Sequence, residues 1–240
     1  MYFTSSLLVA ALLGVAQAQT PSGFKPEVKA KLDVMFNSTA VSAPGKLLTK
    51  AETGSQPQIA VAGNAVNGSG MYMFVMMDLD VPGQGTNTTR RVLLHAMNTG
   101  FKASSQKISS GSTLLTSTEK GPAAYIAPGP PATDTMPHRY VEMLFAQPDD
   151  LAVKATDFAD TSARIGFDLD SFMTKNKLGM PLAANFFTVD GKASAASTPA
   201  RSGSAGMPKS TAAPFTGSAR AVDFSLGLAG VLGGLVVAAI

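Results

Sequence analysis

The 240-residue chain contains no cysteine and only two histidines, His95 and His138. Without cysteine the chain has no disulfide bond, no thiolate metal site and no cysteine nucleophile. A domain without disulfides depends on its hydrophobic core for stability, which favours a full globular fold over a small cross-linked scaffold. Any imidazole chemistry must use one of these two histidines.

A strong excess of charge of one sign is also missing. Residues 19–192 carry sixteen Lys and Arg against fifteen Asp and Glu, so the isoelectric point of about 9.1 reflects only a small excess of base. Domains that bind nucleic acid gather basic residues into patches. We therefore expect no nucleic-acid partner, and the sequence gives no reason to expect a cofactor. The G-x-S-x-G elbow of many serine hydrolases is absent as well.

Residues 1–18 have the pattern of a secretory signal peptide. The apolar run LLVAALLGVA (7–16) is too short to span a bilayer as a helix. It is followed by Ala16-Gln17-Ala18, which has the small-x-small spacing of a cleavage site. We expect cleavage after residue 18, so that the folded domain begins at residue 19.

The C-terminal part has two different compositions. Residues 193–216 are dominated by Ala, Ser, Thr, Pro and Gly, which favours a disordered stalk. Residues 217–240 combine small residues, a short polar spacer and an uncharged apolar tail, the layout of a glycosylphosphatidylinositol (GPI) attachment signal. We expect attachment at Gly217. The alternative is a single transmembrane helix, for which the apolar residues 226–240 are short.

Three N-glycosylation sequons occur in the chain, at Asn37, Asn67 and Asn87. Glycosylation and lipid anchoring both require entry into the secretory pathway, so the two expectations support one another. Together they predict a secreted glycoprotein held on the outer face of the plasma membrane, or in the cell wall, through a GPI anchor.

Residues 19–192 are expected to form one domain made mostly of strands. The segment KLDVMF (31–36) alternates apolar and polar residues, and the continuous apolar run MYMFVMM (71–77) is typical of a central strand. Strands at this spacing, joined by Pro- and Gly-rich turns, predict a mainly β sandwich or barrel with one or two peripheral helices. The expected strands are 31–36, 45–50, 58–63, 71–77, 91–97, 139–147 and 185–189.

One helix is predicted within residues 167–181. Asp168 is a suitable N-cap, Gly179 a suitable residue to end the helix, and Pro181 lies just beyond it. Leu169 and Phe172 fall on one face and would bury against the sheet.

The stretch MDLDVPG (77–83) ends the central strand with two carboxylates, Asp78 and Asp80. Side chains at i and i+2 of a strand point to one face, so we expect these carboxylates to converge. Such a pair needs a cation, hydrogen bonds or water. A solvated strand end and a metal site for a nucleotide-sugar are the open alternatives.

Two further patches carry unusual chemistry: His95, within a predicted strand, and the segment from YIAPGPP (125–131) to His138-Arg139-Tyr140. A lone strand histidine is more often structural than catalytic. Arg139 has the alternative role of pairing with a carboxylate inside the fold.

In order and spacing, the motifs DLDVP, LLH, APGPPATDTMPHRY and VEMLFAQ resemble those of the phosphatidylethanolamine-binding protein (PEBP) family. The ending FDLDSFMTKNKLGMPLAANFF is similar to the closing helix and strand of that family, so the resemblance runs over residues 24–189. Combined with an anchor-type tail, it suggests a secreted, fungal-type member.

The resemblance implies a small surface pocket that takes an anion, typically phosphate or a phosphoethanolamine-like head group. One aspartate would fix a histidine tautomer and the other would face the ammonium of a zwitterionic ligand. The family also suggests a cis bond before Pro82. By motif, the lining would be Asp78, Asp80, Pro82, His95, Gly129, Pro131, His138 and Tyr140.

Two departures from the family pattern adjoin the implied pocket. The strand after His95 is expected to turn soon, near Gly100, and the loop between Pro131 and His138 holds one residue more than is usual.

The sequence therefore predicts a non-enzymatic binding module for an anionic or zwitterionic ligand, with a secreted peptidase as a further candidate partner. A phosphoester hydrolase that uses Asp78 or Asp80 with His95, and a structural surface protein with a vestigial pocket, are the alternatives. Turnover separates an enzyme from a binder.

Overall fold

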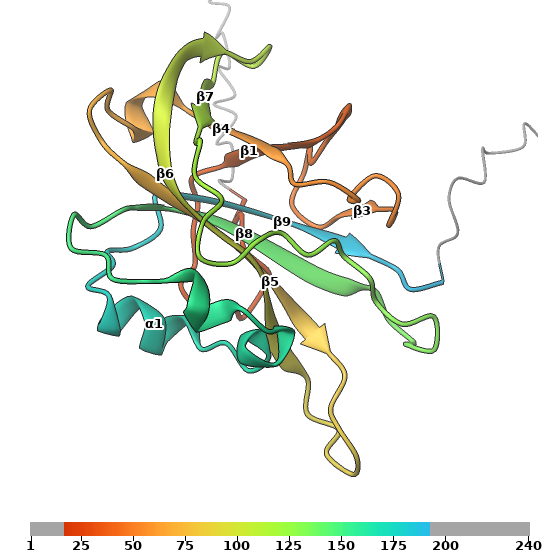
Figure 1. Cartoon of the computed structure of the whole chain (residues 1–240). Coiled ribbons are helices and arrows are strands. Elements are labelled where there is room, and N and C mark those ends of the chain that lie inside the picture. The colour runs from red at the N-terminus through yellow and green to blue at the C-terminus, as the bar shows by residue number, and fades with distance from the viewer. Residues whose placement is uncertain (1–16, 193–240) are drawn as a thin grey trace, which may run out of the picture. The chain divides into compact units, whose positions relative to one another are not determined.

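A computed structural model describes residues 17–192 (Figure 1). Nine strands form one sheet in the order β2-β1-β4-β7-β6-β5-β8-β9-β3, and all neighbours are antiparallel except β9 and β3. The strands are β1 (Leu32–Phe36), β2 (Thr39–Ala40), β3 (Lys46–Leu48), β4 (Gln58–Val61), β5 (Tyr72–Val81), β6 (Arg91–Lys107), β7 (Thr113–Thr116), β8 (His138–Ala146) and β9 (Ala183–Val189).

The sheet is strongly curved, so that β1, β4 and β7 cover one face of β5, β8 and β9. The core between these two walls includes Phe36, Ile59, Phe74 and Tyr140, all fully buried. Asn185 of β9 donates through Nδ2 to the carbonyl oxygens of Leu32, on β1, and Val41, just after β2, at 2.9 and 3.2 Å. The predicted mainly β, barrel-like fold is therefore confirmed, as a half-barrel.

Helix α1 (Leu169–Lys175) lies against the other face of β5 and β8, where Figure 1 shows it beside the 3₁₀ turns at 155–158 and 161–164. Asp168 is its N-cap, as predicted, and accepts a hydrogen bond from the Ser171 amide at 3.0 Å. The helix ends earlier than expected, because Lys177 and not Gly179 adopts the left-handed conformation, with φ of 53°. The buried side chains of Leu169 and Phe172 join a second apolar core.

The prediction of a short strand after His95 was wrong, as strand β6 shows. It continues to Lys107, first paired with β5 and then with β7. Gly100 does not end the strand, because it sits at a register shift of the β5–β6 ladder with φ of 68°, a backbone conformation that glycine adopts without strain.

The cis bond suggested before Pro82 is also corrected. Within residues 17–192 the one cis peptide is Lys25–Pro26, and the Val81–Pro82 bond is trans. Strands β2 and β7, which are short, were not predicted from the sequence.

No helix in the described part of the chain is long and apolar enough to cross a membrane. The predicted stalk at 193–216, the GPI signal at 217–240 with Gly217, and nearly all of the signal peptide at 1–18 lie outside the described residues.

Candidate functional site

Asp78, at the end of β5, pairs with His138, at the start of β8. Asp78 Oδ2 lies 2.7 Å from His138 Nδ1, and both residues are almost completely buried. The two strands are antiparallel with Asp78 opposite Tyr140, which brings the start of β8 to the acidic end of β5. Two motifs that the sequence placed sixty residues apart thus form one cluster.

The other ring nitrogen of His138 contacts a second carboxylate. Nε2 lies 2.9 Å from Asp134 Oδ2, so the ring is held between two aspartates. Burial opposes the charged form, but the hydrogen bonds to Asp78 and Asp134 raise the pKa of His138 overall. The ring is therefore an imidazolium that donates from both nitrogens.

Asp134 is in turn bound by Arg90, whose guanidinium donates to both carboxylate oxygens at 2.5 and 2.8 Å. Arg90 also donates to the Asp80 carbonyl oxygen at 2.6 Å. The Arg90 guanidinium and the His138 hydrogen bond lower the pKa of the Asp134 carboxyl well below its usual range. Neither Arg90 nor Asp134 was predicted as a site residue.

The Asp80 carboxylate has a different partner from the Asp78 carboxylate, although the Asp80 backbone amide donates to Asp78 Oδ1 at 2.7 Å. Asp80 binds Arg139, which donates from its backbone amide at 2.9 Å and from its guanidinium at 2.8 Å to each carboxylate oxygen. Burial still alternates along this end of β5, with Asp78 and Asp80 inside and Leu79 and Val81 partly exposed, so the two aspartates share a face but bind different partners. The alternative role for Arg139, pairing with a carboxylate inside the fold, is the one that the structure contains.

His95, in the middle of β6, is buried next to this cluster. Its Nδ1 lies 2.7 Å from the Ile126 carbonyl oxygen, which can only accept, so Nδ1 carries the proton. Burial lowers the pKa of His95, which leaves the ring neutral at neutral pH. Its Nε2 is then an acceptor, 3.9 Å from Asp78 Oδ2, and has no hydrogen-bond partner among the described residues.

Tyr140 lies between the two histidines. Its ring packs edge-on against His95, with centroids 5.1 Å apart, and stacks on Phe187 at 5.2 Å. Its hydroxyl is buried within reach of the Asp78 carboxylate and the Gly129 backbone, but it forms no hydrogen bond of good geometry with either, nor with any other described residue. Burial, with Asp78 close by, raises the pKa of Tyr140 well above its usual value.

The remaining predicted residues lie around this cluster. Gly129 and Pro131 are exposed in the segment that runs past the cluster, and Pro82 is half-buried after β5. Pro82, Arg90 and Asp134 line a surface hollow of about 330 Å³. The structure thus brings together Asp78, His95, His138 and Tyr140, and directs Asp80 to Arg139 instead.

Glu142 was missed as a residue of interest. It lies two positions after Tyr140 on β8, is fully buried, and neither carboxylate oxygen has a hydrogen-bond partner in the described chain. Burial raises the pKa of Glu142 well above its usual value, so the side chain is a neutral acid. The sequence did hold a signal, because alternation places this acid in the same row as Tyr140 and Leu144.

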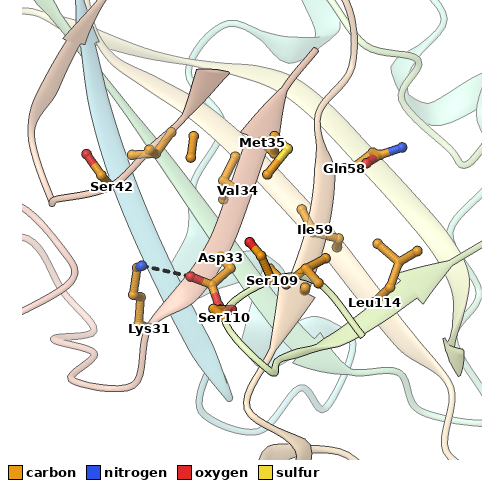
Figure 2. Close-up of a pocket in the computed structure, with 14 residues that line it drawn as sticks. Lys31, Asp33, Val34, Met35, Ser42, Gln58, Ile59, Ser109, Ser110 and Leu114 are labelled. Carbon is orange, nitrogen blue, oxygen red and sulfur yellow. Dashed lines mark hydrogen bonds and ion pairs between the residues drawn. The ribbon is translucent and has the colours of Figure 1, made fainter. Parts of the chain in front are cut away.

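A separate cavity of about 200 Å³ lies beside β1, β4 and β7 (Figure 2). Apolar side chains such as Met35, Ile59 and Leu114 line it, and the Lys31–Asp33 ion pair, at 2.7 Å, stands at its edge. The predicted site residues are not part of this lining. Within residues 17–192, no group of three or more His, Asp or Glu side chains is arranged to hold a metal ion.

Comparison with known proteins assigns the family. The family model described as phosphatidylethanolamine-binding protein matches residues 37–187. Phomoidride biosynthesis cluster protein N of Talaromyces stipitatus is 32% identical over 197 residues, which cover 76% of this chain and 96% of that protein. The 26 kDa secreted antigen of Toxocara canis is 27% identical over 159 residues, which cover 65% of this chain and 55% of the antigen.

Among solved structures, the chain is similar to carboxypeptidase Y inhibitor, crystallised in complex with its cognate proteinase. The TM-score is 0.52 at 22% identity, over 68% of this chain and 84% of the inhibitor, a likeness that concerns the fold. The family model covers more than half of the chain, and this match assigns the family. The chain belongs to the phosphatidylethanolamine-binding protein family.

Proposed function

We propose that this protein is a non-enzymatic binding module that recognises a phosphate-type head group, phosphate itself or a zwitterion such as phosphoethanolamine. One observation carries the proposal. His95 Nε2 and the Tyr140 hydroxyl are buried beside Asp78 and have no hydrogen-bond partner among residues 17–192. Buried polar atoms are nearly always paired in folded proteins, so two unpaired atoms side by side favour a place where a polar ligand binds.

The chemistry of these two atoms favours a ligand with both acceptors and donors. The Tyr140 hydroxyl donates to a phosphate oxygen, whereas the neutral His95 Nε2 accepts. Asp78, next to it, is also an acceptor. A protonated phosphate oxygen or an ammonium group satisfies both acceptors, and the phosphate oxygens accept from Tyr140.

The hydrogen bonds that the two histidines already make favour binding over catalysis. Both nitrogens of His138 are hydrogen-bonded to carboxylates, and His95 Nδ1 is bound to a backbone carbonyl. A general base needs a free nitrogen within reach of the proton that it removes. Of the four imidazole nitrogens only His95 Nε2 is free, and among the described residues no nucleophile is hydrogen-bonded to it.

We also propose that the protein acts outside the cell, held there by a GPI anchor, and that a secreted peptidase is a candidate protein partner. The signal-type sequence at 1–18 and the anchor-type sequence at 217–240 support the location. The three sequon asparagines, Asn37, Asn67 and Asn87, are all exposed, as glycosylation requires. A similar fold occurs in an inhibitor bound to its proteinase, which supports the candidate partner.

The test is an NMR titration of the purified full chain with phosphoethanolamine and with inorganic phosphate. Saturable shifts at His95 and Tyr140 are expected. Tyr140→Phe should weaken binding about tenfold, because it removes one donor to a charged ligand without changing the ring. A matched control is Tyr125→Phe, since that hydroxyl is already bonded to the Thr53 carbonyl at 2.6 Å.

The absence of saturable shifts at millimolar ligand would contradict the proposal and favour a surface scaffold. Release of inorganic phosphate from phosphoethanolamine during the titration would replace it with the hydrolase alternative. Cleavage of a peptide substrate by a secreted carboxypeptidase, with and without the protein, tests the candidate partner separately.

A further inference from the structure

Arg164, the last residue of the second 3₁₀ turn, is a buried arginine. Only 6% of its surface is accessible, and among residues 17–192 no carboxylate forms an ion pair with its guanidinium. Arginine is among the residues least often buried, and a buried one is normally paired with an acid. Arg164 is therefore buried for a reason other than an ion pair.

The guanidinium of Arg164 donates to two backbone carbonyl oxygens. Nε donates to Phe158, which ends the first 3₁₀ turn, at 3.0 Å, and Nη1 donates to Ala124 at 2.6 Å. These bonds do not neutralise the charge, because a carbonyl group is a dipole and not an anion. Burial lowers the pKa of Arg164, yet a guanidinium stays protonated at neutral pH. The fold thus keeps a full positive charge in this region.

This buried charge lies beside the part of β6 that carries His95. Two segments cover the edge of β6 that faces away from β5. In the first segment, Ala123 forms a bridge with Met97. In the second, which starts directly after the buried arginine, Ile165 forms a bridge with Leu93. His95 lies between these two positions, and the arginine side chain ties the two segments together.

The other charges of the candidate site match one another. Three carboxylates and three cations are joined by ion pairs: Asp78, Asp80 and Asp134 with Arg90, His138 and Arg139. The ring of His95 is neutral. The charge of Arg164 therefore remains as an excess, and an excess positive charge next to a buried site attracts an anion.

We propose that Arg164 supplies the positive charge that attracts the phosphate group of the ligand, and that it positions the segment against which His95 is held. Arg164 does not touch the ligand in this role. This inference rests on the proposed function. It implies that inorganic phosphate depends on Arg164 more than phosphoethanolamine does, because the ammonium group of phosphoethanolamine cancels part of the attraction.

The pKa of His95 depends on the same charge. The titratable and charged groups that face its ring are Asp78 on β5, His138 and Tyr140 on β8, and Arg164 on the 3₁₀ turn. Burial is the main cause of the lowered pKa of His95. The hydrogen bond to a backbone carbonyl and the charge of Asp78 oppose it, whereas His138 and Arg164 lower the pKa further. Loss of the Arg164 charge should therefore raise the pKa of His95.

Arg164→Gln and Arg164→Lys test the inference in the full chain. Both variants lose the guanidinium that spans two carbonyls, but only the lysine variant keeps the charge. In NMR titrations, inorganic phosphate should bind Arg164→Gln about fivefold more weakly than the wild-type chain, and phosphoethanolamine should lose no more than about twofold. Both ligands should bind Arg164→Lys within about twofold of the wild-type chain. Lys102→Gln removes a charge from an exposed position farther along β6 and should leave binding unchanged.

A pH titration of the NMR signals of the His95 ring is the second measurement. The pKa of His95 should rise in Arg164→Gln and stay at the wild-type value in Arg164→Lys. Restoration by lysine distinguishes the charge from packing, because lysine restores the cation and not the shape of the guanidinium.

The outcomes separate this inference from the proposed function. Unchanged phosphate binding by a folded Arg164→Gln, or equal losses in both variants, overturns the inference and leaves the proposed function standing. If thermal unfolding shows that Arg164→Gln does not fold, the lysine variant decides. Phosphate binding within about twofold of the wild-type chain then supports the charge role, and a loss of about fivefold overturns it. No binding by the wild-type chain overturns both.

Discussion

Asp80 and Arg139 are joined by three hydrogen bonds, one from the backbone amide and two from the guanidinium. Asp80 is buried, whereas the side chain of Arg139 is 40% exposed. This pair ties the end of β5 to the start of β8, and so fixes the place where Asp78 meets His138. Its role is to position the site, since both carboxylate oxygens of Asp80 accept hydrogen bonds from Arg139.

Asp80→Asn should lower the free energy of unfolding by about 2 kcal/mol, less than for a fully buried ion pair because Arg139 reaches solvent. Urea unfolding at pH 7 measures it. Burial raises the pKa of Asp80, but the Arg139 hydrogen bonds lower it overall below its usual value. The contribution is therefore present above the unfolded value of 3.8 and is lost as pH falls through the folded value. If wild type and variant differ as much at pH 2 as at pH 7, the ion pair is not the cause.

Glu142 should destabilise the folded protein. It is buried in the row that includes Tyr140 and Leu144, and its neighbour across the ladder, Asn185, gives its amide hydrogens to two backbone carbonyls, on β1 and just after β2. A buried polar group without a partner costs about 1–3 kcal/mol. Glu142→Leu should therefore raise the free energy of unfolding at pH 7 by about this amount.

The pH dependence of that gain provides the check. Because the folded pKa of Glu142 is raised, its neutral form is fully present below the unfolded value of 4.5, and stability is lost as pH rises toward the folded value. The advantage of Glu142→Leu in urea unfolding should grow from pH 4.5 to pH 8. An advantage that is constant over this range would indicate packing alone.

Asp80 and Glu142 illustrate how much of the site the sequence can predict. Periodicity and turn residues predicted most strands and the N-cap at Asp168, because those signals are local. The motif resemblance placed Asp78 and His138 in one site. The contact between Arg90 and Asp134 was not predictable, because it joins two loops whose approach depends on the whole ladder of β5, β6 and β8. Glu142 was predicted only as one residue of an alternating strand. Alternation alone does not show whether a polar side chain on a given face of a curved sheet finds hydrogen-bond partners.

His138 should make the protein less stable in alkaline conditions. Burial opposes its protonation, yet the bonds to Asp78 and Asp134 raise its pKa above the unfolded value of 6.5. Its contribution is therefore complete below pH 6.5 and is lost as pH rises through the folded value. In His138→Gln this alkaline loss should disappear, which thermal unfolding between pH 6 and pH 9 measures. The Glu142→Leu background removes a second buried group with a raised pKa whose ordinary value lies below this pH range. A loss that persists in the double variant would refute the assignment to His138.

Gly121 should be required for the position of His95. The segment after Gly121 runs along β6, where Ala123 and Met97 exchange two backbone hydrogen bonds and the Ile126 carbonyl fixes the His95 tautomer. Gly121 has φ of 73°, and a Cβ there would overlap the Met97 carbonyl oxygen. Gly121→Ala therefore combines conformational strain with a clash against backbone.

Gly111→Ala is the matched control for this effect, because Gly111 has φ of 84° but open space around it. The control should lose about 1 kcal/mol in urea unfolding, the cost of the left-handed conformation for alanine. Gly121→Ala should lose about 1–3 kcal/mol more, and it should also shift the NMR signals of the His95 ring. Equal losses for the two variants, with the His95 signals unmoved, would contradict this prediction. They would mean that the segment after Gly121 shifts without cost, and that the packing of this segment against β6 does not set the tautomer of His95.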